Sequence, residues 1–173
     1  MMTKVKVLSL AALALPLAAN AQPAAQDWDV SLSGAGMAQN DFKGSPRSGS
    51  SGNFGAQLSL GYFVNDNVEV AVRQSLFYAS STVGALWNGN TQAAIDYNLH
   101  MDKFVPFVGA NLGYGYGNKG FTDTWNFGPE AGIKWYLQEK AYMFGMAEYL
   151  MPFKGKTFNN GSWAFTLGVG MNL

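Results

Sequence analysis

The chain has 173 residues, no cysteine, and 11 Lys and Arg residues against 11 Asp and Glu. The missing cysteine excludes disulfides and thiolate metal sites, and the balanced formal charge gives no argument for a nucleic-acid partner. Charged residues make up only 13% of the chain, about half the usual share of roughly a quarter, whereas glycine and aromatic residues are abundant.

The first segment has the layout of a secretory signal peptide. Lys4 and Lys6 precede an apolar run over residues 7–19, and small residues at Ala19 and Ala21 end it. The run has about 13 residues, which is shorter than the roughly 17–25 that a membrane-spanning helix needs. We therefore expect residues 1–21 to be a cleaved signal and residues 22–173 to form a single exported domain.

Apolar residues recur at every second position in the rest of the chain, which predicts β-strands with two different faces. The last segment is the cleanest, because Trp163, Phe165 and Leu167 alternate with small or polar residues. Eight segments show this pattern, with the seventh the least regular: residues 28–33, 54–62, 68–73, 92–99, 108–115, 127–137, 142–151 and 163–173. A soluble sandwich would show the same alternation, so the pattern alone leaves soluble and membrane folds open.

The connections between these segments alternate in length. Short turns are expected at residues 65–67, 100–103 and 138–140, and long polar loops at residues 40–52, 80–90, 117–125 and 153–161. An up-and-down transmembrane barrel with short periplasmic turns and longer outer loops has this order. The sequence therefore predicts an all-β fold, an eight-stranded antiparallel up-and-down transmembrane β-barrel.

Aromatic residues gather near both ends of the predicted strands, where amphipathic rings favour the two membrane–water interfaces. Trp28, Tyr62, Phe63, Tyr97, Phe104, Trp135, Tyr136 and Tyr142 lie toward the short turns. Phe54, Tyr78, Trp87, Tyr114, Tyr116, Trp125, Phe127, Phe153 and Trp163 lie toward the long loops. We expect two aromatic girdles around the barrel, although core aromatics would give a similar pattern.

Three segments resemble the strands of small outer-membrane β-barrel proteins: GYFVNDNVEV at residues 61–70, PFVGANLGYG at 106–115 and GPEAGIKWYL at 128–137. The resemblance extends over nearly the whole exported chain and points to the outer-membrane protein β-barrel domain family, akin to OmpX and the transmembrane domain of OmpA. It implies a monomeric, porin-like barrel without a wide pore in the outer membrane of a Gram-negative bacterium. It also implies a role in membrane integrity, adhesion or host contact.

Two positions depart from the family pattern. Members usually end in an aromatic residue that the barrel-insertion machinery reads during assembly, whereas this chain ends in Leu173. Strict alternation from Val68 also places Gln74 on the lipid face, which suggests a bulge or a shifted register there.

Ionisable residues within the strands fall on the inward positions, which spares them the roughly 2–4 kcal/mol that a Lys or Arg facing mid-membrane lipid would cost. We expect Arg73 and Lys134 to pair with the acids and plug the lumen, because an eight-stranded barrel leaves room only for side chains. The alternative is a narrow ion path or a proton relay. The predicted lumen network consists of Glu69, Arg73, Asp96, Glu130, Lys134 and Glu148.

Catalysis has little support in the sequence. The one histidine, His100, falls in a short turn, with no serine beside it, where we expect a solvated side chain. A single histidine without cysteine also makes no usual transition-metal set. We expect no catalytic residues, no cofactor and no bound metal.

The long loops are net basic and would face outer-leaflet lipopolysaccharide, whose phosphates Lys and Arg bind well. The cations concerned are Lys43, Arg47, Lys119, Lys154 and Lys156. A solvated loop surface is the alternative interpretation.

Three functions remain open at this point. The first is a non-enzymatic structural or interaction protein whose loops meet an extracellular ligand. The second is a channel or transporter for small solutes or ions. The third is a lipid-modifying barrel enzyme, which the absence of a Ser–His arrangement disfavours.

Overall fold

The computed structural model describes residues 23–38, 54–81, 84–118, 123–153 and 161–173. These residues form strands whose bounds are β1 (Trp28–Ala38), β2 (Phe54–Phe63), β3 (Val68–Ser81), β4 (Gly84–Asn98), β5 (Phe104–Gly117), β6 (Thr124–Tyr136), β7 (Ala141–Pro152) and β8 (Ser162–Asn172). The predicted signal at residues 1–21 lies outside the described residues.

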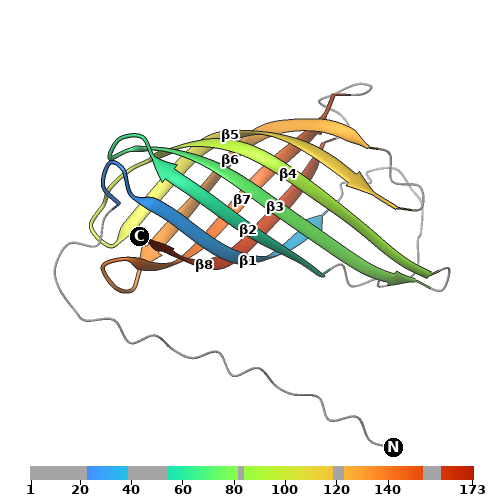
Figure 1. The fold of residues 1–173 in the computed structure, drawn as a ribbon, viewed down its shortest axis with the longest axis horizontal. Helices are drawn as coiled ribbons and strands as arrows, with labels where there is room; N and C mark the ends of the chain where they lie inside the picture. The colour runs from blue at the N-terminus through green and yellow to red at the C-terminus, as the bar shows by residue number, and fades with distance from the viewer. Residues whose placement is uncertain (1–22, 39–53, 82–83, 119–122, 154–160) are drawn as a thin grey trace, which may run out of the picture.

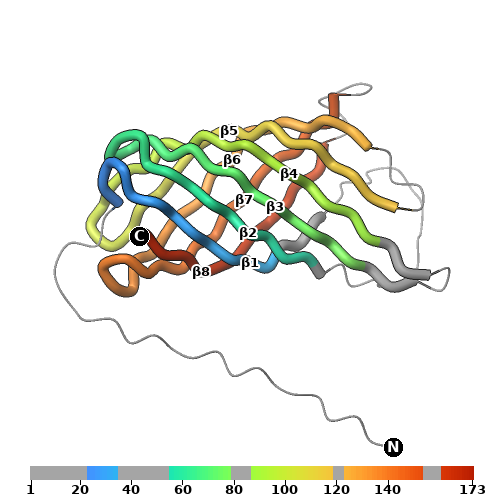
Figure 2. Tube along the Cα trace, in the orientation of Figure 1, coloured from blue at the N-terminus to red at the C-terminus, as the bar shows by residue number. Residues whose placement is uncertain are grey.

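The strands form one closed antiparallel barrel in which each strand pairs with its neighbours in the sequence. β1 and β8 close the barrel through a continuous register from Asp29 opposite Asn172 to Ala38 opposite Trp163. Figures 1 and 2 show the result, with the first and last strands side by side in blue and red. The predicted eight-stranded up-and-down barrel is confirmed. The described residues contain no helix long and apolar enough to cross a membrane.

The three short turns lie at one end of the barrel, as the sequence predicts, and local chemistry explains two of them. The side-chain oxygen of Asn65 accepts hydrogen bonds of 2.9 Å from the backbone N–H groups of Asn67 and Val68, which closes the β2–β3 turn. In the β4–β5 turn, Asp102 has a φ of 56°, a left-handed conformation that Asp tolerates better than most residues.

One of the expected long loops is wrong. The polar stretch at residues 80–90 belongs largely to a β3–β4 hairpin, in which pairing continues through Tyr78 opposite Trp87 to Ser81 opposite Gly84. Polar composition is misleading here, because a strand that extends beyond the hydrocarbon no longer needs an apolar face. The other three long connections join β1 to β2, β5 to β6 and β7 to β8.

The two faces of the barrel wall are opposite to those of a soluble barrel. Outward residues are apolar and exposed, with Leu32, Val72 and Leu167 at 58%, 58% and 73%. Inward residues are mostly polar and buried, among them Ser31, Gln57, Gln92, Asn111 and Thr166. Three aromatics expected in a girdle, Phe63, Tyr136 and Tyr142, instead face inward and are almost fully buried.

The expected bulge at Gln74 is also wrong. Gln74 keeps an unbroken register, opposite Leu58 on β2 and Thr91 on β4. Its side chain lies half-buried on the outer face, where its amide donates to the hydroxyl of Tyr116 at 2.9 Å and accepts from that of Thr91 at 2.7 Å. Side-chain partners, rather than a change of register, therefore accommodate this polar residue.

The closed barrel predicts heat-modifiable migration in gel electrophoresis. With no free strand edge from which to fray, the barrel should stay folded in detergent until it is boiled. Boiled and unboiled samples should therefore run at different positions. Identical migration, or a compact fold that is soluble without detergent, would contradict the assignment.

Candidate functional site

The structure places all the residues of the predicted lumen network inside the barrel, each of them buried. Glu69 and Arg73 come from β3, Asp96 from β4, Glu130 and Lys134 from β6, and Glu148 from β7. The strict alternation of the strands is the reason, since each residue lies two or four positions from another inward residue on its own strand.

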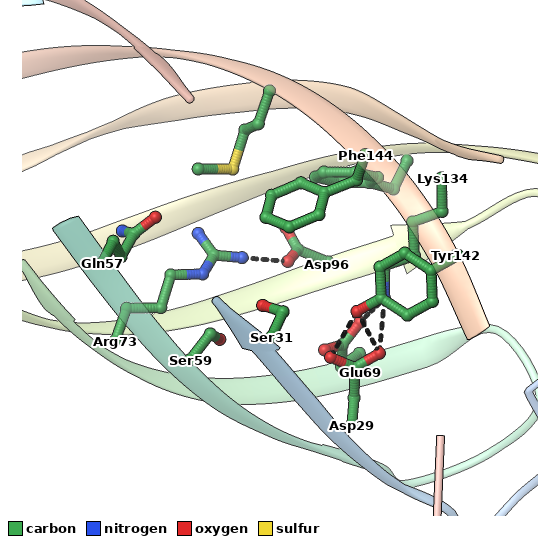
Figure 3. A pocket seen from close by; sticks show the side chains of 12 residues that line it. Asp29, Ser31, Gln57, Ser59, Glu69, Arg73, Asp96, Lys134, Tyr142 and Phe144 are labelled. Atoms are coloured by element: carbon green, nitrogen blue, oxygen red, sulfur yellow. Dashed lines mark hydrogen bonds and ion pairs between the residues drawn. The ribbon is translucent and has the colours of Figure 1, made fainter. Parts of the chain in front are cut away.

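Arg73 forms the first of two ion clusters. Its guanidinium donates from Nη2 to Oδ2 of Asp96 and from Nη1 to Oε1 of Glu130, both at 2.6 Å. Asp96 lies on the neighbouring strand, but Glu130 lies across the lumen on β6. Arg73 therefore links strands that share no backbone hydrogen bonds. Figure 3 shows its contact with Asp96.

Lys134 forms the second cluster, closer to the short turns. Its Nζ donates to Oε2 of Glu69 at 2.8 Å and to Oδ2 of Asp29 at 3.2 Å. The hydroxyl of Tyr142 also reaches the Asp29 carboxylate at 2.6 Å. The ammonium lies 5.2 Å from the ring centre of Phe63 and 5.1 Å from that of Tyr142. Aromatic faces and carboxylates together replace the water that a buried ammonium has lost.

Glu148 has no cation within salt-bridge distance among the described residues, contrary to the expectation that it pairs with Arg73 or Lys134. Amides take that place: Gln92 and Asn111 donate to its Oε2 at 3.0 and 3.1 Å. The same Asn111 nitrogen also donates to Glu130 at 2.6 Å, so it joins Glu148 to the Arg73 cluster.

Inward glycines provide the space for these large side chains. A Cβ at Gly61 would collide with the carboxylate of Glu69, and a Cβ at Gly109 with the carboxylate of Asp96. At Gly170 a Cβ would meet the ring of Tyr142. Gly109 and Gly170 lie directly opposite Asp96 and Tyr142 on the neighbouring strand, and Gly61 lies diagonally across from Glu69. The glycine pattern of the strands is therefore complementary to the charged and aromatic residues.

The space between the two ion clusters is small. A cavity of about 20 Å³ lies there, lined by residues that include Ser31, Ser59, Arg73 and Lys134 (Figure 3). That is room for about one water molecule. The side chains thus fill this level of the barrel.

Sequence reasoning misses several members of the network. Asp29 alternates with Trp28 and Val30, so the sequence alone places it on the inner face. With Asp29 added, the network contains every buried acid among the described residues. Tyr142 is expected in a girdle, although its position on β7 makes it inward. Gln92 and Asn111 carry no charge, and nothing local marks them as partners of Glu148.

The other candidate residues do not join this site. His100 lies in the β4–β5 turn, half-buried, with its Nδ1 at 3.2 Å from the side-chain nitrogen of Asn67, so it is less solvated than expected. The loop cations Lys43, Arg47, Lys119, Lys154 and Lys156 lie outside the described residues. Within the described ranges, no three His, Asp or Glu side chains converge in a way that could hold a metal ion.

An apolar, exposed outer wall around a filled, charged interior defines a class of protein. Soluble monomers rarely expose apolar patches larger than a few hundred Å², whereas a barrel in lipid is apolar outside and polar inside. The fold and its interior are those of a small transmembrane β-barrel.

The family follows from the sequence. The chain matches the model of the outer membrane protein beta-barrel domain over residues 8–173, and it belongs to that family. The family implies a place in the bacterial outer membrane. A search of curated protein sequences finds no match.

Solved structures support the fold. The N-terminal β-barrel domain of OprF from Pseudomonas aeruginosa matches with a TM-score of 0.64 at 18% identity, covering 87% of this chain and 100% of that one. OprG from the same organism has a TM-score of 0.64 at 12% identity, covering 90% and 99%. Ail, the attachment invasion locus protein of Yersinia pestis, has 0.54 at 13%, covering 86% and 99%.

The ion clusters predict a large difference between buried and exposed lysines. Lys134→Met should lower the free energy of unfolding by roughly 3–5 kcal/mol, because it leaves Asp29 and Glu69 buried without a counter-ion. Lys140→Met, in the exposed β6–β7 turn, should change little. A urea unfolding series in lipid measures both.

A second substitution tests the pairing itself. Adding Glu69→Gln to Lys134→Met should recover part of the loss, because one carboxylate fewer is left uncompensated. Adding Glu148→Gln, whose carboxylate contacts amides and not Lys134, should not. Equal costs for Lys134→Met and Lys140→Met would contradict the network.

Proposed function

We propose that this protein is a non-enzymatic outer-membrane barrel whose lumen is plugged by charged side chains, and that it acts through its wall and its outer connections. The observation that carries the proposal is the pair of ion clusters with a gap of about 20 Å³ between them. Solute passage would require the ion pairs to separate inside a low-dielectric interior, which is costly.

The direction of the contacts favours a plug over a gated pore. Arg73 connects β3 to β6, Lys134 connects β6 to β1 and β3, and Gln92 connects β4 to β7. These bonds cross the lumen at several levels, so opening it would break more than one of them together.

With the lumen plugged, binding would take place at the long connections between the strands. Connections at residues 39–53, 118–123 and 153–161 join strands at the end opposite the short turns. A rigid barrel with long connections at one end is a scaffold for display, because binding residues concentrate on loops held by rigid elements. Ail, an attachment invasion locus protein by name, has a barrel of similar fold, which supports a role in adhesion for this chain. A role in membrane integrity is the other part of the proposal.

We further propose contacts of the basic connections with lipopolysaccharide phosphates, through Lys43, Arg47, Lys119, Lys154 and Lys156. Assembly by the barrel-insertion machinery and a monomeric state in the membrane fit the closed barrel. An extracellular ligand would bind at the end of the barrel opposite the short turns.

The plug predicts negligible conductance. Planar-bilayer recording of the reconstituted protein should show no steady openings, since Arg73 and Lys134 block the interior. The double variant Arg73→Ala with Lys134→Ala removes both cations and should produce openings if it stays folded, whereas Lys140→Ala should not. Steady single-channel currents from the unmodified protein would favour the small-solute or ion channel instead.

A deletion strain distinguishes a non-enzymatic scaffold from a lipid-modifying enzyme. We expect deletion to change envelope permeability or adherence while the acyl composition of the outer-membrane lipids stays the same, as measured by lipid mass spectrometry. Complementation with the unmodified chain should restore the phenotype. A lipid species that disappears on deletion and returns on complementation would replace this proposal with a lipid-modifying enzyme.

A further inference from the structure

We propose that the lumen contains a binding site for Ca²⁺, formed by two carboxylates and two side-chain amides on one part of its wall. The residues are Gln92 on β4, Asn111 on β5, Glu130 on β6 and Glu148 on β7. These strands are consecutive in the barrel, and the residues are all buried on its inner face. The site would exist in a plugged or an open lumen, so its test and the conductance test fail independently.

The charges around Arg73 do not cancel. Arg73 pairs with Asp96 and Glu130, and the amide of Asn111 joins Glu148 to the same cluster. In the ionised state, three carboxylates therefore face one guanidinium, and two negative charges remain. Hydrogen bonds from amides lower the cost of burying Glu148, but they add no positive charge. A single divalent cation would neutralise the cluster.

Two of these carboxylates lie next to each other. Glu130 and Glu148 are directly opposite in the β6–β7 register, an arrangement of like charges that destabilises a strand pair. The Nδ2 atom of Asn111 contacts both, at 2.6 Å from Oε2 of Glu130 and 3.1 Å from Oε2 of Glu148. The two Oε2 atoms therefore face the same point, where a cation would be attracted to both carboxylates at once.

The amide oxygens at this point have no hydrogen-bond donor. Oε1 of Gln92 and Oδ1 of Asn111 are without a partner among the described residues, although the two residues are only 1% and 5% exposed. Buried polar atoms in proteins almost always have a partner. Each oxygen belongs to an amide whose nitrogen contacts Glu148, so both lie beside the carboxylates. Oxygen atoms without donors, next to uncompensated carboxylates, indicate a cation as the missing partner.

The spacing of these groups fits one ion. A half-turn of an amide exchanges its nitrogen and its oxygen and leaves the rest of the side chain in place. The Gln92 oxygen would then lie 3.0 Å from Oε2 of Glu148, and the Asn111 oxygen 3.1 Å from the same atom and 2.6 Å from Oε2 of Glu130. Oxygens that bind one Ca²⁺ at roughly 2.3–2.6 Å lie about 3 Å from each other. The turned amides and the two carboxylates therefore have the spacing of a Ca²⁺ ligand set.

The types of ligand favour Ca²⁺ over other metals. Ca²⁺ binds carboxylate and amide oxygens together with water in flexible geometry, whereas Mg²⁺ requires a near-ideal octahedron. The expectation of no bound metal rests on the nitrogen and sulfur ligands of transition metals, which Ca²⁺ does not need. A site with two carboxylates also agrees with the absence of three converging acids within the described ranges.

Polar residues lie between this site and the outer end of the barrel. Asn90 precedes Gln92 on β4 and Asn126 precedes Glu130 on β6, each on the side of the long connections. Both asparagines are buried, and Nδ2 of Asn126 donates to Oδ1 of Asn90 at 3.1 Å. Ca²⁺ from the external medium would therefore find oxygen ligands on its way to the site.

The test is equilibrium dialysis of radioactive Ca²⁺ against the full protein in phosphatidylcholine bilayers, which carry no net charge. The unmodified protein should bind one Ca²⁺ per barrel, and Glu148→Gln should lower the affinity at least about tenfold, because affinity follows the number of charged ligands. This variant should fold, since it removes an uncompensated charge. Glu139→Gln is the same chemical change in the β6–β7 turn and should bind Ca²⁺ as the unmodified protein does.

A second variant should shift the affinity in the opposite direction. Gln92→Glu adds a third carboxylate, so it should raise the affinity for Ca²⁺ about tenfold. It should also make unfolding in urea depend on Ca²⁺, with a lower midpoint in a chelator and recovery on adding the ion. If Gln92 only donated a hydrogen bond to Glu148, Ca²⁺ would not restore the loss.

Three outcomes would overturn the site. The first is an unmodified protein that binds no Ca²⁺, which would mean that protons balance the extra carboxylates. The second is binding that survives Glu148→Gln, which would place the ion elsewhere on the chain. The third is equal loss of binding in Glu148→Gln and Glu139→Gln, which would reflect the net charge of the protein and no particular site.

Discussion

The burial of two cations in a membrane-spanning barrel is the constraint on which the rest of the structure depends. Arg73 and Lys134 cannot face lipid without a large cost, and inside they need counter-ions. Each receives two carboxylates, and at least one of the two comes from a strand that is not a hydrogen-bonded neighbour. The ion pairs that compensate the buried charges therefore also join strands on opposite sides of the barrel. The small cavity of about 20 Å³ between the two clusters is a consequence of this arrangement.

The interior has more acids than bases, and the structure balances them in two ways. Among the described residues, Asp29, Glu69, Asp96, Glu130 and Glu148 are buried against Arg73 and Lys134 alone. Carboxylates near the cations are held by ion pairs, and Glu148 is held by amide donors from Gln92 and Asn111. Charge-assisted hydrogen bonds from neutral amides are stronger than ordinary ones, so an acid can be buried here without its own cation.

The sequence specifies the wall of this barrel better than its interior contacts. Alternation assigns Glu69, Arg73 and Lys134 to the inner face because a strand has a strict period of two. Which acid meets which base depends on the stagger of strands across the lumen, which no local pattern encodes. Glu148 illustrates the limit, since its position is predictable from the sequence and its amide partners are not.

Two errors share a different cause. The expectations for residues 80–90 and for Gln74 both rest on polarity alone, which shows neither where a strand extends beyond the hydrocarbon nor which partners a neighbouring strand supplies. The β3–β4 hairpin continues to Ser81 and Gly84, at the end of the barrel where apolar side chains give way to polar ones. Gln74 stays in register because neighbouring strands supply its partners, and those partners are far from it in sequence.

Adjacent residues of β3 show how one strand serves both environments. Arg73 points inward to two carboxylates, and Gln74 points outward to a hydroxyl on each of two strands. Inside, glycines such as Gly109 leave room for the carboxylate of Asp96; outside, Gly89 leaves room for the ring of Tyr116. The inner contacts join strands across the lumen, and the outer ones join Gln74, Thr91 and Tyr116 along the wall. One strand of such a barrel can therefore carry polar side chains on both faces, because neighbouring strands supply their partners on each side.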